Sequence, residues 1–559
     1  MTMVAESGDL TVAPEAAPQL DAASDSIAVA AWTLVSRITG VAKIAAIGAV
    51  LGPTFLGNTF QLTNSLPNLI YFGLLAGSLF SSLLVPALVE HIDAEDQGAS
   101  ERIAGGLLGM TLLALVVATP LAIALGPMVL RVASFGGPDG VGAAQANLGQ
   151  LLILMFVPQL FLYAVVGTAS AAMNAHRRFA LAAAAPAVEN IGLLTVLATS
   201  AVIFPARTRI DQVPTGMLLL LGLGSTGAVA LHAALQWWGA RRAGVTLLPR
   251  SGWRDPDVLV VVRRALPSLA QAGLVAVQVL VMLALANRVP GGVTALQISL
   301  NFYFLAIALG TTPVALSLLP RLARLSARGA AAEFSDTFVR GISLGFFVAI
   351  PAAVGCVTLA WPVAHAVSIG RMNTPAGVAM VAGSMAALAV AIVAQNVFMI
   401  ATYASYARLD TRSPLHAMVL QAVTCLSLAG FALLAHGSAV LVILGSAFSV
   451  SIVVAAVHLT VHLRINLVRG SARLASSAVK IGLGAAFMAG PAALTAMAVT
   501  FWVGRPLGSG LAVIAATVVG VAAFVAAETA LRAPELAWLS GGAGLLRVKA
   551  IGALRARHG

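Results

Sequence analysis

Long apolar stretches follow one another along almost the whole chain, separated by charged residues, proline or glycine. A helix of about 20 apolar residues crosses a bilayer, whereas a barrel strand needs only about 10 residues of alternating character. Because backbone groups in lipid must be hydrogen-bonded internally, continuous stretches of this length are helices. We therefore predict an all-α polytopic membrane protein with about 14 transmembrane helices. They lie at 26–50, 59–90, 103–126, 149–172, 180–203, 214–236, 260–287, 294–320, 341–366, 376–405, 414–435, 438–462, 475–503 and 507–531.

The composition excludes several classes of protein. Hydrophobic residues make up 59% of the chain and charged residues 9%, against about 25% charged residues in soluble domains. This balance excludes a water-soluble enzyme and a nucleic-acid-binding domain. The two cysteines, Cys356 and Cys425, lie in apolar stretches and indicate no disulfide framework. We predict no cofactor and no metal site.

The distribution of Lys and Arg tests the helix count, because cytoplasmic loops are enriched in them. With the N-terminus inside and fourteen spans, 23 of the 32 basic residues fall on the inner side and six in outer connections. We therefore expect a multi-pass protein of the plasma (inner, cytoplasmic) membrane with both termini in the cytoplasm. The net charge of +12 then faces anionic membrane lipids.

Two pairs of similar segments recur at nearly one spacing. The segment MNAHRRFALAAAAP at 173–186 is similar to SYARLDTRSPLHAM at 405–418, and the sequence around Pro86 is similar to that around Pro320. The prolines are 234 residues apart, so the copies lie six spans apart and share one orientation. Parallel repeats predict two pseudo-symmetric six-helix lobes around a central cavity that opens alternately to each face.

The remaining divisions follow from this repeat. The N-lobe is 26–236 (helices 1–6), the C-lobe is 259–465 (helices 7–12), and 237–258 is a cytoplasmic amphipathic linker. Two further helices occupy 474–532. Residues 1–25 carry acidic but no basic side chains, which predicts a disordered acidic cytoplasmic tail. Apolar and basic residues alternate in 533–559, as in amphipathic segments that lie on a membrane surface.

Four motifs, in order along residues 26–470, resemble the MurJ/MviN family of the MOP exporter superfamily. They are SRITGVAK at 36–43 with LPNLIYFGLLAGSLFSSLLVPALVE at 66–90, then 174–179 with Ala185, Pro186 and Asn190, then 318–320, and finally 406–414. The composition suits a divergent, actinobacterial member. The resemblance implies a transporter rather than an enzyme. The implied flippase carries lipid II, an undecaprenyl-pyrophosphate-linked muropeptide, to the outer leaflet for peptidoglycan synthesis.

The implied substrate carries an anionic pyrophosphate, so basic residues inside the spans are candidate ligands. Arg37 lies near the middle of the first span, where a cation costs about 2.5–3.5 kcal/mol, and we expect it to face a wet cavity. Lys43 lies about 120° round the same helix. It either shares the cavity wall or extends to the membrane interface. Both match basic positions of the family motif.

Amide side chains are the candidate ligands for the head group. The second span offers four and the eighth span two: Asn58, Gln61, Asn64 and Asn68, then Gln297 and Asn301. Three of the first set share one helix face, and we expect the second set to face them across the cavity. The alternative role is hydrogen bonding between helices.

The chain departs from the family pattern where that pattern has charges. Asn58, Ile44, Ala76 and Asn301 stand at charged positions, and Tyr71 with Phe72 replaces an arginine pair. Fewer cations weaken the assignment of lipid II more than the assignment of a flippase.

Other charges have separate predicted roles. Glu189 is a candidate for ion coupling through a bound proton, or it pairs with Arg178; the alternative is a simple interfacial charge. Arg178, Arg408 and Asp410 lie in inner connections and are predicted to form an inside gate. We expect His232 to be a hydrogen-bonded polar residue.

We therefore predict an alternating-access flippase for a polyprenyl-linked cell-wall precursor, with lipid II as the first candidate. The open alternatives are a flippase for another lipid-linked glycan, a multidrug or cation antiporter, and a non-transporting scaffold. Expected partners are the polyprenyl-linked lipid, membrane lipids and cell-wall synthesis proteins, without nucleic acid, and we expect a monomer.

Overall fold

The computed structural model describes residues 17–70, 84–94, 96–133, 141–204, 209–463, 468–504 and 507–536. Every regular element in these ranges is helical. The α-helices are α1 Ala17–Leu51, α2 Phe55–Ile70, α3 Val85–Asp93, α4 Gln97–Ala133, α5 Val141–Ala175, α6 Phe179–Ile203, α7 Thr215–Arg242, α8 Pro256–Ala286, α9 Gly292–Ala306, α10 Thr312–Ala327, α11 Ala331–Thr358, α12 Ala360–Val367, α13 Pro375–Ala407, α14 Arg412–Ala429, α15 Ser438–His462, α16 Val468–Val503 and α17 Leu507–Ala530. Short helical turns are η2 Ile210–Gln212, η3 Gly252–Arg254, η4 Ile307–Thr311, η5 Gly370–Met372 and η6 Gly430–Leu434.

The described residues contain 13 helical stretches that are long and apolar enough to cross a membrane. They match thirteen of the predicted spans in order. The fourteenth, 59–90, is described only at its ends, by α2 and α3, and its middle, with Tyr71, Phe72 and Ala76, lies outside the described residues. An all-helical polytopic fold is thus confirmed.

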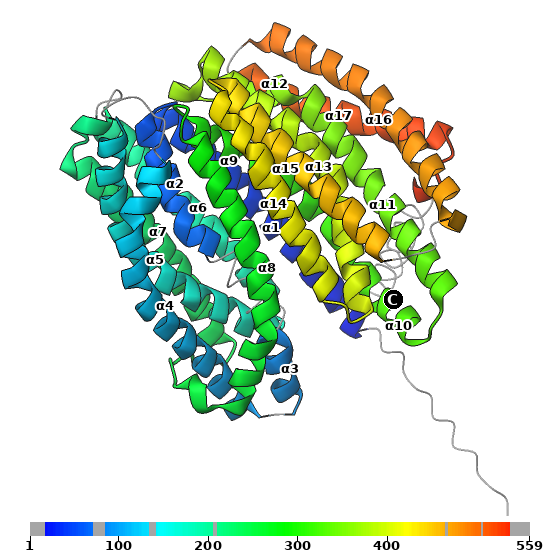
Figure 1. Cartoon of the computed structure of the whole chain (residues 1–559), viewed down its shortest axis with the longest axis horizontal. Coiled ribbons are helices and arrows are strands. Elements are labelled where there is room, and N and C mark those ends of the chain that lie inside the picture. The colour runs from blue at the N-terminus through cyan, green and yellow to red at the C-terminus, as the bar shows by residue number, and fades with distance from the viewer. Residues whose placement is uncertain are drawn as a thin grey trace, which may run out of the picture.

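The helices form two groups that repeat one packing pattern (Figure 1). In the first group α1 packs on α6, α2 and α4 on α5, and α7 on both α5 and α6. In the second group α8 packs on α14, α9 and α11 on α13, and α15 on both α13 and α14. These are the same pairs six spans later, as expected for two equivalent lobes. The last two long helices join the second group, since α16 contacts α11 and α17 contacts α12.

The first helix of each group also crosses to the other group. Helix α1 contacts α9, and α8 contacts α2. The α9 region is not one straight helix: a π-helical turn, η4, separates it from α10 just before Pro313. Proline lacks a backbone donor and its ring crowds the preceding turn, so a wider turn relieves the conflict. The eighth span is therefore interrupted by a π-helical turn directly before its proline.

Helix α1 begins at Ala17, so the predicted disordered tail was wrong for residues 17–25. This segment is rich in alanine with proline near its start, both of which favour a helical first turn. Residues 1–16 lie outside the described residues, as does 537–559, which holds most of the predicted basic C-terminal segment.

The connection between the two groups, predicted at 237–258, is helical only at its ends and in η3. It lies against α4, where the backbone N–H of Arg250 donates to the carbonyl of Gly105 at 2.9 Å and that of Thr246 to Glu101 Oε1 at 2.9 Å. A side chain at Gly105 or Gly109 would overlap carbonyl oxygens of this connection. We call residues 243–255 the linker.

Arg102 of α4 forms ion pairs at the C-terminal end of the linker. Its guanidinium donates to Asp255 and, at 3.1 Å, to Asp257 Oδ2. Partial burial acts to raise the pKa of Asp255, but the guanidinium and the backbone N–H groups of Asp257 and Val258 outweigh it and hold that pKa below its ordinary value. Asp255 also caps α8. The start of α8 is thereby tied to the first group.

Candidate functional site

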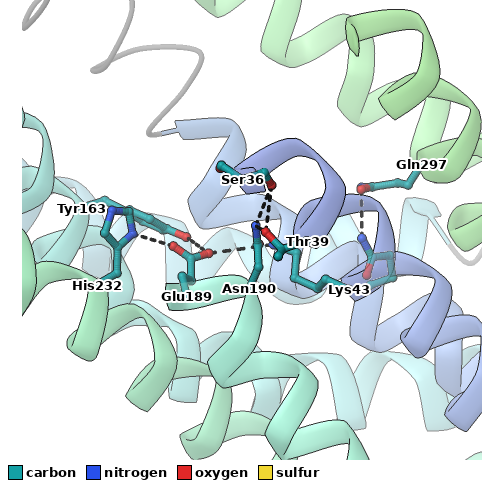
Figure 2. Close-up of polar contacts among 9 residues, drawn as sticks. Ser36, Thr39, Lys43, Tyr163, Glu189, Asn190, His232 and Gln297 are labelled. Atoms are coloured by element: carbon teal, nitrogen blue, oxygen red, sulfur yellow. Dashed lines mark hydrogen bonds and ion pairs between the residues drawn. The ribbon is translucent and has the colours of Figure 1, made fainter. Parts of the chain in front are cut away.

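Helix α1 faces α6 along a narrow polar stripe. The amide of Asn190 on α6 donates to the carbonyl of Ser36 and to Thr39 Oγ1, both at 3.2 Å (Figure 2). Gly40 lies beside this amide, and a Cβ there would make ordinary van der Waals contact with it, at 3.6 Å. The stripe continues to Lys43, which lies one turn further along α1.

Glu189, the neighbour of Asn190, lies at the centre of a buried cluster of four helices. Tyr163 of α5 donates to Oε1 at 3.0 Å, and His232 Nδ1 of α7 lies 2.8 Å from Oε2. Lys43 Nζ of α1 lies 3.9 Å from Oε1 (Figure 2). The side chains of Glu189, Lys43 and His232 are 12%, 14% and 3% exposed. A carboxylate at this depth is tolerated because hydrogen bonds and a cation offset its desolvation. We call these four residues the Glu189 cluster.

The structure corrects the pairing expected for Glu189. Its cation is Lys43, not Arg178, and it is buried rather than interfacial. His232 is hydrogen-bonded, as expected. Tyr163 was not foreseen, because one tyrosine in an apolar helix gives no signal until the partner helix is known. The role of Glu189 in ion coupling stays a prediction.

Arg37 lies on the exposed side of α1, and among the described residues it has no hydrogen bond or ion pair. From residue 31 to 42 every described side chain of α1 is exposed or half-exposed, whereas Ile44, Ile47 and Leu51 are buried. The helix therefore passes from an open environment, beside α6, into a closed one between the two groups.

The closed end is built by the α1–α2 and α8–α9 connections. Asn58 is fully buried, and its amide donates to the carbonyl of Val289 at 2.8 Å and accepts from the N–H of Val293 at 3.2 Å. Gln145 of α5 adds hydrogen bonds to Thr59 and Asn287. Arg371 reaches from η5 to the carbonyl of Val50 at 3.0 Å.

One turn further along, the two groups are joined by amide side chains. Gln61 of α2 donates to Gln297 Oε1 of α9 at 2.9 Å, and Gln297 Nε2 donates to Ser65 at 2.6 Å. The predicted facing of these two spans is thus present. We call the contacts of Asn58, Gln61, Ser65, Gln297 and Arg371 across the groups the outer seam, because they lie on the predicted outer side.

Beyond the outer seam the amides are half-exposed. Asn64 and Asn68 continue the Gln61 face of α2, and Asn301 lies one turn after Gln297, bonded to its carbonyl at 2.9 Å. These three have exposed surface in this conformation, whereas Asn58 has none. Whether any of them contacts a substrate stays a prediction.

The predicted gate residues lie at the opposite end. Arg408 stacks over Phe334 at 4.5 Å and donates to the carbonyl of Leu463. Asp410 Oδ1 accepts from the N–H groups of Arg412 and Ser413, both at 3.0 Å, and so begins α14. Burial acts to raise the pKa of Asp410, but the bonds from Ser413 and Arg412 outweigh it and lower that pKa. Arg178 is exposed at the start of α6.

Within the part of the chain that the structure describes, Arg178 forms no ion pair with Asp410 and no hydrogen bond with Arg408 or Asp410, so these interactions do not join the gate residues in this conformation. The same part of the chain holds no group of three or more His, Cys, Asp or Glu side chains placed to bind a metal ion.

Comparison with known proteins agrees with this architecture. The family model described as "Lipid II flippase MurJ" matches residues 47–509. A probable lipid II flippase MurJ of Haemophilus influenzae is 26% identical over 423 residues, covering 72% of this chain and 79% of that protein. The lipid II flippase MurJ of Burkholderia cenocepacia is 24% identical over 400 residues, covering 69% and 74%.

Two solved structures share the fold. A lipid II flippase MurJ in an inward closed conformation aligns with a TM-score of 0.69 at 13% identity, covering 90% of this chain and 98% of that one. An inward-facing multidrug resistance MATE transporter of the MOP superfamily aligns with a TM-score of 0.61 at 13% identity, covering 81% and 98%. The family match, which spans more than half of the sequence, shows that this chain belongs to the lipid II flippase MurJ family of transporters.

Proposed function

We propose that the protein moves lipid II from the inner to the outer leaflet of the plasma membrane for peptidoglycan synthesis. The observation that carries this proposal is the family match over residues 47–509. Two relatives that align over more than two thirds of the chain are named a probable lipid II flippase MurJ and a lipid II flippase MurJ. The MATE-like fold alone supports only a transporter, because unrelated substrates are carried on one fold.

The conformation described here is proposed to face the cytoplasm. The outer seam closes one end of the interface between the two groups, while residues 31–42 of α1, before the seam, are exposed or half-exposed. Arg37, exposed and unpaired among the described residues, would bind the pyrophosphate together with Lys43. A guanidinium suits phosphate oxygens because it donates in a bidentate manner. Asn64, Asn68 and Asn301 would contact the head group.

Transport then requires the outer seam to open. Opening breaks the Gln61–Gln297 bond and the contacts of Asn58, and these amides would become head-group ligands only in the outward-facing state. Arg178, Arg408 and Asp410 would close the inner side as a gate. The polyprenyl tail stays in lipid throughout. The binding roles of all these residues, the gate and the orientation are parts of the proposal.

The test is transport of fluorescent lipid II by the full chain in proteoliposomes, read by quenching of the label in the outer leaflet. We expect the wild type to equilibrate the label and Arg37→Ala to slow transport at least about tenfold, since a charged hydrogen bond to phosphate contributes about 1.5–3 kcal/mol. Arg340→Ala removes an exposed arginine of α11 and serves as the matched control. Transport by Arg37→Ala at the wild-type rate would remove this residue from the site.

A second lipid-linked glycan is the one rival that an observation favours. Asn58 and Asn301 are neutral at positions that are charged in the family pattern, and Asn58 is engaged in the seam. The same vesicles are therefore loaded with an undecaprenyl-pyrophosphate-linked glycan that lacks the peptide. Transport of this lipid with no transport of lipid II would overturn lipid II as the substrate.

A further inference from the structure

Lys43, the cation of the Glu189 cluster, is also a proposed ligand of the lipid pyrophosphate. We propose that the lipid pyrophosphate and Glu189 compete for Lys43. When Lys43 binds the pyrophosphate, the Glu189–His232 pair takes up one proton. Substrate entry and proton binding are then coupled. This inference rests on the proposed function, because the lipid pyrophosphate is the competing anion.

The contacts of Glu189 are unequal. Tyr163 and His232 lie at hydrogen-bond distance, at 3.0 and 2.8 Å, whereas Lys43 Nζ lies at 3.9 Å, beyond a direct hydrogen bond. Lys43 also comes from α1, whose preceding turns, at 31–42, are exposed or half-exposed, while Tyr163 and His232 are buried side chains of α5 and α7. A lysine head on a flexible four-carbon chain can turn to another anion at low cost. Lys43 is therefore the partner that can leave.

Charge balance in the cluster then calls for a proton. With Lys43 in place and His232 neutral, the cluster carries no net charge. When Lys43 turns to the pyrophosphate, the buried carboxylate of Glu189 is left uncompensated, which is costly in a membrane interior. One proton from water, taken up at His232 Nε2, makes an imidazolium and restores neutrality. Histidine suits this role because a neutral imidazole, already donating through Nδ1, has a free second nitrogen that can bind one further proton.

Gln236, one turn from His232 on α7, can satisfy both protonation states. Its Nε2 lies 3.5 Å from His232 Nε2, where it donates to a neutral ring, and its Oε1 is buried without a hydrogen-bond partner in the described part of the chain. Rotation of the amide by 180° would offer Oε1 to the N–H of an imidazolium, in exchange for the bond that Nε2 now donates to the carbonyl of Ala182 at 3.3 Å. Gln236 Oε1 is thus available to accept a hydrogen bond from the added N–H of His232.

The helices packed on α6 are α1, α5 and α7. The charged or titratable groups that they turn toward Glu189, within the described residues, are Lys43, Tyr163 and His232. Tyr163 donates its hydroxyl to Glu189 in either state. His232 is therefore the group that changes charge.

The test measures protons taken up when undecaprenyl pyrophosphate binds to the full chain in nanodiscs. Calorimetry in buffers of different ionisation enthalpy at one neutral pH gives this number. We expect the wild type to take up about one proton per bound lipid. Its Kd should then increase as the pH increases, by up to about tenfold per pH unit. Glu189→Gln removes the carboxylate but keeps its shape, so it should bind with no proton uptake and a Kd independent of pH. Glu333→Gln, on the exposed side of α11, is the control.

The outcomes separate the two proposals. Wild-type binding without proton uptake overturns the coupling and leaves the proposed function intact. Proton uptake that persists in Glu189→Gln overturns the assignment to this cluster. Absence of wild-type binding overturns both. If Glu189→Gln does not fold, Lys43→Met replaces it: without its lysine the cluster is already protonated, so residual binding should again take up no proton.

Discussion

Single glycines of α4 determine how closely the linker can approach the first group. A Cβ at Gly109 would overlap the carbonyl oxygen of Arg250, which is backbone and cannot turn away. Gly109→Ala is therefore expected to displace the linker and to lower stability by about 1–3 kcal/mol, as overpacking does. Thermal unfolding of the full chain in detergent measures the loss. Gly227→Ala on α7 meets open space and should not lower the unfolding temperature, since alanine favours a helix over glycine; equal losses for the two substitutions would contradict the close contact.

Asp255 gives a prediction for acid pH at the same scale. Its pKa is lowered in the folded protein, so its pairing with Arg102 stabilises fully above the ordinary carboxyl pKa of about 3.9 and is lost as the pH falls through the lowered value. Asp255→Asn keeps the cap of α8 and removes only the charge. We expect it to cost about 1 kcal/mol at pH 7 and nothing at the lowest pH at which the wild type remains folded.

Thermal unfolding against pH measures this difference. Asp257→Asn, whose side chain is 44% exposed, is the control and should have a smaller effect. A cost for Asp255→Asn that does not change between pH 7 and the acid limit would show that its charge is not what stabilises the linker.

The sequence predicted residue types better than residue partners. Arg37 and Lys43 were singled out because a cation in a span is costly, and that argument needs no fold. Their different environments were not predictable, because the partner of Lys43, Glu189, lies on a helix far along the chain. Likewise Asn58 resembles a ligand in a polar stripe until its amide is found bonded to the backbone around residues 289–293.

At the scale of elements, the proposed transport cycle depends on α2 and α9 moving apart. Gln61→Cys with Gln297→Cys, in a Cys356→Ser and Cys425→Ala background, places two thiols where the amides now meet at 2.9 Å. A short bifunctional maleimide should link them and stop transport in the proteoliposome assay, because the outer seam can no longer open. Each single cysteine treated alike is the control. Full transport after complete linking would show that the seam does not open during the cycle.

Element boundaries show what periodicity misses. The apolar pattern of α1 begins near residue 26, but the helix begins at Ala17, because alanine extends a helix without contributing to a hydrophobic pattern. A proline inside an apolar span permits an irregular turn, and the form of that turn before Pro313, a π-helix, is known only from the structure. The linker was expected to be amphipathic and cytoplasmic. Its close packing on α4 depends on Gly105 and Gly109, which lie against linker carbonyls, and on the hydrogen bond from Arg250 to Gly105. These contacts join two separate segments, so neither segment alone predicts them.

At the scale of the whole molecule, the repeat was the most informative part of the sequence. Two segment pairs at nearly one spacing predicted two equivalent groups, and the packing of α1 on α6 recurs as α8 on α14. The repeat could be found because the offset requires no knowledge of side-chain contacts. The outer seam could not be predicted from the sequence, because it forms where the two groups meet and depends on the conformation that the molecule adopts.

The orientation in the membrane is the last prediction, and it follows from charge at this scale. Inner connections hold 23 basic residues and outer ones six, a bias that places the linker inside and η2 outside. In intact cells, an impermeant maleimide should label Asp211→Cys in η2 and not Ser251→Cys in the linker; both positions are exposed. After the membrane is permeabilised, both should react. Because α7 alone separates the two positions, labelling of Ser251→Cys in intact cells would reverse the orientation, and the outer seam would then close the cytoplasmic side.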